Sequence, residues 1–283
     1  MRKTPPPVSL LPSRNCFPPF PLSRLLDFLL CLFPTFSLFR PMSQIPPLFK
    51  REFLGYFRSP VAYVFLIVFL MASVGCAFFL GGFFRNEIAS LDSYFQFLPW
   101  LFIPFIPAVG MRLWSEEKRA GTIELLFTLP VTTLEAVLGK FLAAWAFLCL
   151  AILLSCPMVV TVAYLGDPDW GVLASSYLGS MLMAGGFLGV CSLTSAFTKN
   201  QVVSFVLSVF VCFLLVLLGW SVFTDFLGGY LAFPAWLVDA VSNFSFKTHF
   251  DAFAKGIVDP KDVMFFLSLS GFCLFLNVLV LDR

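Results

Sequence analysis

Charged side chains are scarce in this 283-residue chain, where Asp, Glu, Lys and Arg make up only 12% of the residues. Soluble domains carry about 25% charged and about 45–50% apolar residues, whereas this chain is 59% hydrophobic, with a mean hydropathy of +0.93. Water cannot be the solvent for that much apolar surface, so a lipid bilayer must surround most of the chain. The formal net charge of +2 is also too small to indicate nucleic-acid binding.

The residue patterns of common catalytic and metal sites are missing as well. The eight cysteines form no CxxC pair, and six of them lie in apolar runs. This pattern indicates that the cysteines act as small hydrophobic residues and do not form disulfides or metal sites. The single histidine, His249, is expected to be a surface residue. Gly139-Lys140 is followed by Phe141, so no ATP-binding P-loop is present, and neither HExxH nor GxSxG occurs. The sequence therefore predicts no catalytic, metal-binding or cofactor-binding residue on this chain.

Six apolar segments are long enough to cross a bilayer, which predicts an all-α polytopic membrane protein with six transmembrane helices. The predicted spans are Val61–Phe84, Tyr94–Met111, Phe141–Gly166, Trp170–Thr198, Asn200–Thr224 and Val263–Leu281. None of them contains Asp, Glu, Lys, Arg or His, which counts against a proton- or sodium-driven carrier.

Two of the spans carry features that predict their local structure. The second contains Pro99, Pro104 and Pro107, so a kinked or partly broken helix is expected there. The fourth places small residues at four-residue spacing, with two glycines beside them, which predicts close helix packing. These small residues are Ser176, Ser180, Ala184, Gly185 and Gly189.

The region before the first span divides into two parts. Residues 1–41 hold nine prolines and five basic residues without helical periodicity, which predicts a disordered tail or an over-extended start, with Met42 as an alternative first residue. From Leu48 onward an aromatic stripe indicates an amphipathic helix at the membrane interface, with basic residues facing away from it. The stripe consists of Phe49, Phe53, Tyr56 and Phe57. Ser59-Pro60 then predicts the start of the first span.

Basic residues are distributed unequally between the two sides of the six predicted spans. One side holds Lys50, Arg51, Arg58, Arg112, Lys118, Arg119, Lys140, Lys199 and Arg283, and the other only Arg85, Lys247, Lys255 and Lys261. Because an excess of Lys and Arg marks the cytoplasmic side, both termini are expected in the cytosol.

The connection from Asp225 to Asp262 lies on the predicted outer side and is too apolar for a free loop. The helical spacing of Phe246, Phe250, Phe253 and Ile257 predicts a short helix along the outer surface, with Gly256 near its end. Asp259-Pro260 then predicts the N-cap and first turn of the sixth span.

Residues 114–130 form the one long, charge-dense connection between two predicted spans, the second and the third. We name this connection the charged segment. It reads WSEEKRAGTIELLFTLP. Charges precede apolar residues at helical spacing (Ile123, Leu126, Phe127 and Pro130), which indicates a short helix at the membrane surface that Pro130 ends.

The charged segment resembles the cytosolic coupling helix of permease subunits of type 2 ATP-binding-cassette (ABC-2) exporters. The branch containing the gliding-motility and copper-enzyme-maturation permeases is the most similar, and THFDAFAKGIVDPKDV before the last span resembles it too. The resemblance covers about Leu48 to Leu281 and implies a six-span permease domain over residues 42–283. It implies ATPase-coupling roles for Glu116, Glu117, Gly121, Thr122, Glu124, Leu126 and Pro130.

The resemblance also implies partners and a location. A separate ABC ATPase subunit would bind ATP and Mg²⁺, a second permease subunit would form a homodimer or heterodimer with this one, and the complex would lie in a bacterial inner membrane. Two alternatives remain from the residues themselves: an ion-coupled carrier or passive channel, and a membrane scaffold that transports nothing. A neighbouring gene for an ATPase with a P-loop would favour the permease.

Overall fold

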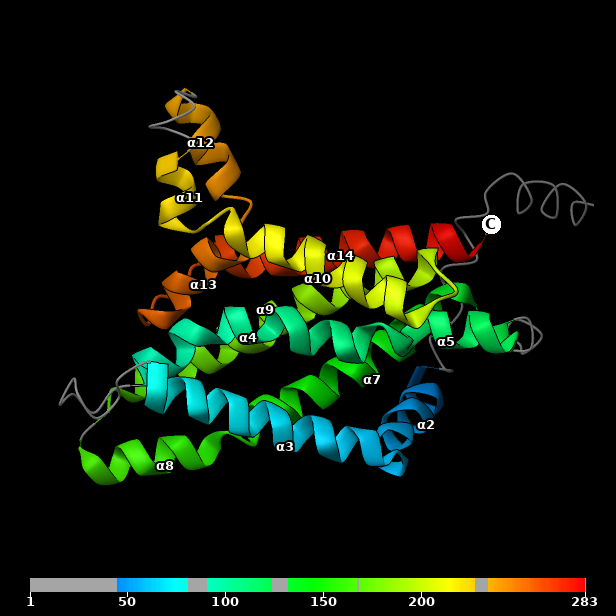
Figure 1. The fold of residues 1–283 in the computed structure, drawn as a ribbon, viewed down its shortest axis with the longest axis horizontal. Coiled ribbons are helices and arrows are strands. Elements are labelled where there is room, and N and C mark those ends of the chain that lie inside the picture. Colours follow the sequence, from blue (N-terminus) through cyan, green and yellow to red (C-terminus); the bar gives the residue numbers. More distant parts are fainter. Residues whose placement is uncertain (1–44, 81–90, 124–131, 167, 227–233, 283) are drawn as a thin grey trace, which may run out of the picture. The chain divides into compact units, whose positions relative to one another are not determined.

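The computed structural model describes residues 45–80, 91–123, 132–166, 168–226 and 234–282, and the regular elements in these ranges are all helices (Figure 1). In chain order they are α2 (Ile45–Arg58), α3 (Pro60–Gly75), the π-helical η2 (Cys76–Leu80), α4 (Asp92–Gly110), α5 (Arg112–Ala120), α7 (Thr133–Leu153), α8 (Cys156–Leu165), α9 (Trp170–Phe197), α10 (Gln201–Leu217), α11 (Ser221–Asp225), α12 (Ala235–Ser242), α13 (Phe246–Ala254) and α14 (Pro260–Leu281). The predicted tail, residues 1–41, lies outside the described residues.

Five helical segments in the described ranges are long and apolar enough to span a membrane. They are Pro60–Phe79, Asp92–Ala120, Thr133–Leu165, Trp170–Phe197 and Pro260–Leu281. The predicted fifth span is shorter than expected, because α10 has 17 residues and is therefore about 25 Å long, against about 30 Å of hydrocarbon. The chain is thus an all-α, multi-pass membrane protein, with α10 as an additional short apolar helix.

Proline affects two spans differently from what the sequence predicts. The three prolines of the second span lie inside α4, which is continuous from Asp92 to Gly110, so the helix is not broken there; a kink stays a prediction. The third span, predicted as one helix, is interrupted by a turn at Leu154 and Ser155, and α8 begins with Pro157 in its first turn. Proline has no N–H to continue the hydrogen-bond ladder of α7, which explains why the interruption falls immediately before it.

Helix α9 is the centre of the bundle and contacts α4, α5, α7, α10, α13 and α14. The predicted small-residue face is confirmed, because Ser176, Ser180 and Ala184 are fully buried. A side chain on Gly189 would lie 3.3 Å from the backbone Cα of Ser270 in α14. The face therefore serves as a packing surface, since small residues allow neighbouring helix backbones to approach closely.

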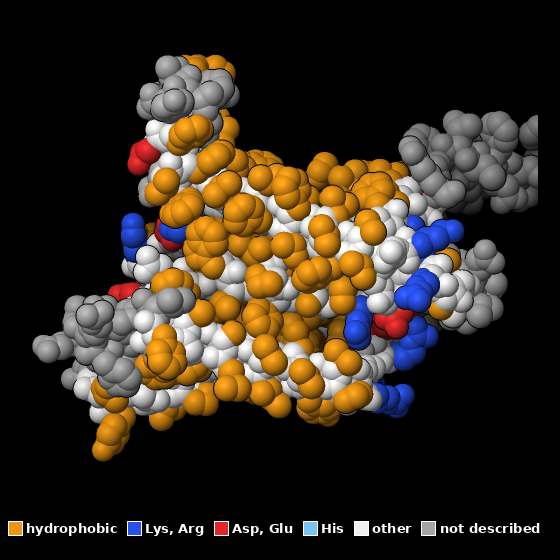
Figure 2. Space-filling view, in the orientation of Figure 1, with side chains coloured by type: hydrophobic (Ala, Val, Ile, Leu, Met, Phe, Trp, Pro, Cys, Tyr) orange, Lys and Arg blue, Asp and Glu red, His pale blue; other side chains and the backbone are white. Residues whose placement is uncertain are grey.

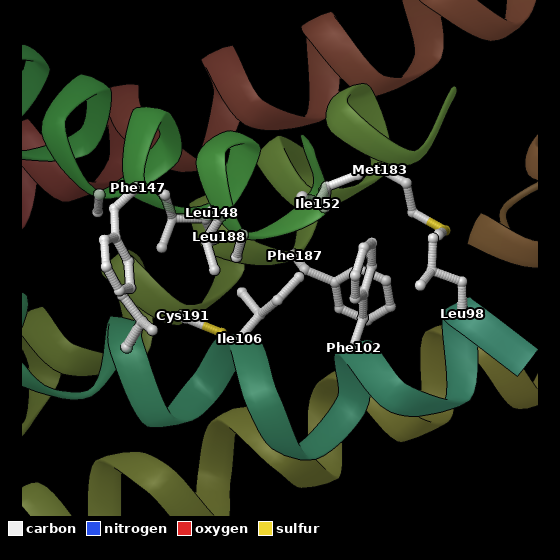
Figure 3. Packing of buried hydrophobic residues seen from close by; sticks show 14 of the residues in the cluster. Leu98, Phe102, Ile106, Phe147, Leu148, Ile152, Met183, Phe187, Leu188 and Cys191 are labelled. Carbon is white, nitrogen blue, oxygen red and sulfur yellow. The ribbon is translucent and has the colours of Figure 1, made fainter. Parts of the chain in front are cut away.

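Large apolar side chains fill the space between α4, α7 and α9 (Figure 3). The labelled members are Leu98, Phe102 and Ile106 from α4, Phe147, Leu148 and Ile152 from α7, and Met183, Phe187, Leu188 and Cys191 from α9. Gly110 permits a close approach of α4 to α9, because a Cβ at that position would lie 2.4 Å from the Cβ of Cys191. Any larger residue at position 110 would push α4 away from α9.

Helix α13 lies at the end of the bundle away from α5 (Figure 1). Its aromatic face is confirmed, with Phe246, Phe250 and Phe253 all buried. These rings pack against the bundle, since Phe246 lies 4.4 Å from Phe187 of α9 between ring centroids; the position of the helix at the outer membrane surface stays a prediction. The helix ends at Ala254, so Ile257 is outside it and exposed.

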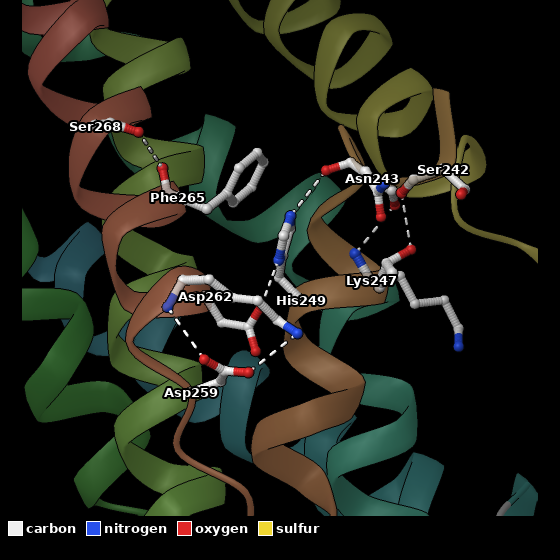
Figure 4. Close-up of polar contacts among 11 residues, drawn as sticks. Ser242, Asn243, Lys247, His249, Asp259, Asp262, Phe265 and Ser268 are labelled. Atoms are coloured by element: carbon white, nitrogen blue, oxygen red, sulfur yellow. Dashed lines mark hydrogen bonds and ion pairs between the residues drawn. The ribbon is translucent and has the colours of Figure 1, made fainter. Parts of the chain in front are cut away.

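His249 joins α13 to the first turn of α14 (Figure 4). Its Nδ1 lies 2.6 Å from Oδ1 of Asp262, its Nε2 lies 2.8 Å from the carbonyl oxygen of Asn243, and its ring stacks on Phe265 at 4.0 Å. The expectation of a surface histidine is wrong, because only 13% of the His249 side chain and 2% of the Asp262 side chain are exposed. Sequence periodicity does not predict this contact, because His249 and Asp262 lie on different helices.

Replacing His249 with alanine is expected to loosen α13. The substitution removes two hydrogen bonds and leaves the buried Asp262 carboxylate without a partner, which typically costs about 1–3 kcal/mol or more. Hydrogen–deuterium exchange of residues 246–254 should accelerate, while exchange in α9 should change little. Lys247→Ala is the control, because Lys247 pairs with Asp251 of the same helix and such an i,i+4 pair contributes only about 0.3–0.5 kcal/mol. Equal exchange in both variants would contradict the proposed link.

Candidate functional site

The first part of the charged segment is a helical extension of α4. Only Met111 separates α5 from α4. Helix α5 carries Glu116, Glu117, Lys118 and Arg119 in its last two turns. Lys and Arg side chains gather at this end of the bundle, whereas the middle is covered by apolar side chains (Figure 2). The charged residues therefore belong to the end of the second span and not to a separate surface helix.

Gly121 ends α5 in a left-handed conformation, with φ of +70°. Its N–H and that of Thr122 both turn back to the carbonyl oxygen of Glu117. Glycine adopts this backbone conformation without steric cost, which explains its place at the helix end. No described residue lies within 4 Å of a Cβ built on Gly121. Close packing against another described helix therefore does not require a glycine at this position.

Hydrogen bonds fix the junction of α4 and α5 to the end of α9. The hydroxyl oxygen of Ser195 accepts from the backbone N–H groups of Trp114 and Ser115 at 3.1 and 3.0 Å, and donates to the carbonyl oxygen of Met111 at 2.9 Å. The Lys118 ammonium donates to the carbonyl oxygen of Ala196. One serine of α9 thus contacts three backbone groups where α4 meets α5.

A buried cation connects α5 to two further helices. Nζ of Lys140, on α7, lies 2.7 Å from Oε1 of Glu117 on α5 and 3.3 Å from Oε2 of Glu52 on α2, and the Lys140 side chain is only 6% exposed. The ammonium also lies 5.6 Å from the ring centroid of Trp114, within reach of a cation–π interaction. We name Lys140, Glu52 and Glu117 the Lys140 cluster.

Helix α2 is held against α7 by apolar contacts as well as by the Lys140 cluster. Leu48 packs on Gly139, where a Cβ would lie 2.7 Å from Leu48 Cδ2, and Tyr56 stacks on Phe147 at 4.9 Å between centroids. The predicted amphipathic helix is confirmed, but its buried side packs on protein.

The ionisation of Glu52 follows from its neighbours. Burial opposes ionisation, but Lys140 and Arg51 outweigh it and hold the pKa of this carboxyl below its ordinary value. Because the pKa is lowered in the folded state, the ion pair contributes stability at neutral pH, and this contribution is lost as pH falls through the lowered pKa.

Replacing Ser195 with alanine is expected to weaken the attachment of α5 to α9. Two buried N–H groups lose their acceptor, which typically costs about 1–3 kcal/mol, so the melting temperature in mild detergent should fall. Ser204→Ala is the matched control, because Ser204 is also a fully buried serine but its hydroxyl has no hydrogen-bond partner among the described residues. Equal melting temperatures for the two variants would show that Ser195 does not hold the junction.

The predicted site residues fall into three groups in the structure. Glu116 and Thr122 are exposed, Gly121 is the exposed end of α5, and Glu117 points inward to Lys140. Glu124, Leu126 and Pro130 lie outside the described residues, as does the predicted helical stripe after Ile123. The structure therefore gives Glu117 a contact within the chain in addition to the role that the resemblance implies.

Sequence reasoning missed the partners of the charged segment: Glu52, Lys140 and Ser195. Lys140 directly precedes the predicted third span, and Ser195 lies near the end of the fourth. The sequence predicts their positions relative to the spans but not their contacts with residues of α5. Among the described residues, no group of three or more His, Cys, Asp or Glu side chains is arranged to hold a metal ion.

Comparison with known proteins identifies the family. The family model described as "ABC-2 family transporter protein" matches residues 48–280. A search of curated proteins found no match. The family match covers every helix of the site: the helix at the membrane interface, the helical extension of the second span, and the helices that hold it. The chain therefore belongs to the ABC-2 transporter family and is a membrane permease component of an ABC transporter.

Proposed function

We propose that this chain forms the translocation path of an ATP-driven exporter and that the charged segment couples it to a separate ATPase subunit. The observation that carries the proposal is the attachment of α5: it continues the second span, is fixed to α9 by Ser195, and is joined to α7 and α2 by Lys140. A contact made at the exposed end of α5 therefore acts on four helices at once.

The mechanical step follows from these contacts. ATP and Mg²⁺ bind to the ATPase subunits, and closure of the ATPase pair displaces the segment that contacts it. Because α5 is continuous with α4 apart from Met111, displacement of its end moves the second span. The Lys140 cluster and Ser195 carry the same displacement to α7 and α9.

The orientation that this function requires agrees with the charge distribution. Lys50, Arg51, Arg112 and Arg119 are exposed on α2 and α5, which lie at the same end of the bundle (Figures 1 and 2). We place this end and both termini in the cytosol, in a bacterial inner membrane, since excess basic residues mark the cytoplasmic side. A second permease subunit, identical or homologous, completes the path.

Site-specific photo-cross-linking tests the ATPase contact. A photoreactive amino acid at Thr122, which is exposed just after α5, should cross-link to a co-purifying ABC ATPase in mild detergent. The same amino acid at Lys255, exposed at the opposite end of the bundle, is the control and should give no such product. Cross-linking from position 255 but not from 122 would overturn both the orientation and the coupling role.

A further inference from the structure

A cavity of about 440 Å³ lies beside the Lys140 cluster, between α2, α3, α5, α7 and the end of α4. This volume lies within the range of roughly 300–1,000 Å³ typical of small-molecule sites. The cavity is at the level where α2, the amphipathic helix, meets the first turns of α3. One end is therefore at the membrane interface and the other faces the hydrocarbon region.

One wall of the cavity is apolar. Val61, Ala62 and Phe65 of α3 line it together with Val109 of α4 and Phe147 of α7. Val61 is 49% exposed and belongs to the same exposed apolar surface of α3 as Val64 and Ile67. The cavity thus meets the surface that α3 presents to lipid, and an acyl chain in the bilayer has lateral access to it.

The opposite wall carries two opposite charges that form no ion pair with another described residue. Arg112 and Glu116 lie one turn apart on α5 and both line the cavity. Arg112 and Glu116 form no ion pair with each other or with any further described residue. Arg112 lies near Tyr56, where burial raises the pKa of the phenol and the positive charge of Arg112 acts to lower it. The remaining charges of this wall, Lys140 with Glu52 and Glu117, are already paired.

We propose that this cavity binds the headgroup and first methylene groups of a zwitterionic phospholipid such as phosphatidylethanolamine. The lipid phosphate accepts hydrogen bonds from the Arg112 guanidinium, and the ammonium donates to the Glu116 carboxylate. An anionic lipid satisfies Arg112 but places its net charge beside Glu116, so it binds less well. A bidentate arginine–phosphate contact supplies both strength and orientation.

The proposal does not depend on the coupling role of α5, because lipid binding is a property of the permease alone. The purified full chain is reconstituted in nanodiscs of equal phosphatidylethanolamine and phosphatidylglycerol, transferred to mild detergent, and analysed for retained lipid by native mass spectrometry. Phosphatidylethanolamine should be retained about tenfold over phosphatidylglycerol, which corresponds to about 1.4 kcal/mol. Equal retention of the two lipids would overturn the proposal.

A cavity-filling variant with a matched control locates the lipid. Gly55 lines the cavity, and no described residue lies within 4 Å of a Cβ built on it, so Gly55→Trp should fill the site and abolish selective retention. Gly271 on α14 is equally open but does not line the cavity, so Gly271→Trp should retain lipid normally. Unchanged retention in Gly55→Trp would place the lipid elsewhere and refute the site.

Two conservative variants test the charges without filling the cavity. Arg112→Gln should reduce the retention of both lipids, because the phosphate loses its guanidinium. Glu116→Gln should reduce only the preference for phosphatidylethanolamine, because the carboxylate that repels an anionic headgroup is gone. If Gly55→Trp instead shifts the mass from dimer to monomer while the lipid count is unchanged, a second copy of this chain occupies the face, and the lipid assignment is wrong.

Discussion

Lys140→Met is expected to be the most destabilising single substitution at the α5 end of the bundle. It removes the cation that pairs with Glu117 and one of the two cations that pair with Glu52, and these carboxylate side chains are only 20% and 24% exposed. Loss of one member of a buried ion pair typically costs about 3–5 kcal/mol, because the remaining charges stay desolvated. The melting temperature in mild detergent should fall sharply, and the attachment of α2 to α7 should weaken, with the apolar contacts of Leu48 and Tyr56 remaining.

The cause of this loss can be isolated by restoring neutrality. Combining Lys140→Met with Glu117→Gln and Glu52→Gln should recover most of the lost stability, since neutral amides are far less costly to bury than unpaired carboxylates. Lys261→Met is the control for replacing a lysine, because the pair of Lys261 with Asp259 is exposed and solvent screens it. A Lys140 variant as stable as the Lys261 variant would show that the Lys140 cluster does not join these helices.

Gly121→Trp is expected to abolish association with the ATPase while the permease remains folded. Residue 121 is exposed at the end of α5, and no described residue lies within 4 Å of a Cβ built there. A tryptophan at this position obstructs a partner's surface. Co-purification of the ATPase should therefore fall by at least about tenfold, as for loss of a binding contact worth 1.4 kcal/mol or more, while membrane insertion and permease dimerisation persist.

The positive φ at Gly121 calls for two controls. Gly121→Ala introduces the backbone strain of a left-handed residue without bulk, and Gly121→Asn introduces a side chain that tolerates this conformation. Both should keep most of the ATPase association. If Gly121→Ala loses as much ATPase association as Gly121→Trp, the position acts only through the backbone conformation of the helix end. Full ATPase association in Gly121→Trp would refute the partner contact.

Features that depend on local periodicity were predictable from the sequence. The aromatic spacing of α2 and α13 and the small residues of α9 each specify one face of one helix. The start of α14 was predictable because Asp259, with its side chain accepting from the N–H of Lys261, immediately precedes Pro260. In each case the residues that determine the structure lie within a few turns of one another.

Features that depend on distant pairs were not predictable in this way. Glu52 and Lys140 come from different helices, as do Trp114 and Ser195, and nothing in the periodicity of either helix selects its partner. The interruption before Pro157 was missed because the surrounding run is uniformly apolar. Apolar composition identifies a span, but it does not distinguish one continuous helix from two helices in sequence.

The close approach of Gly110 to Cys191 has a consequence for how such a protein changes conformation. With no room for even a methyl group between α4 and α9, these helices cannot slide past each other without first separating, and Ser195 prevents separation at one end. We therefore expect the second and fourth spans to move together. In the permease dimer that we propose, alternating access would then arise at the interface between the two subunits, with each subunit tilting as a unit.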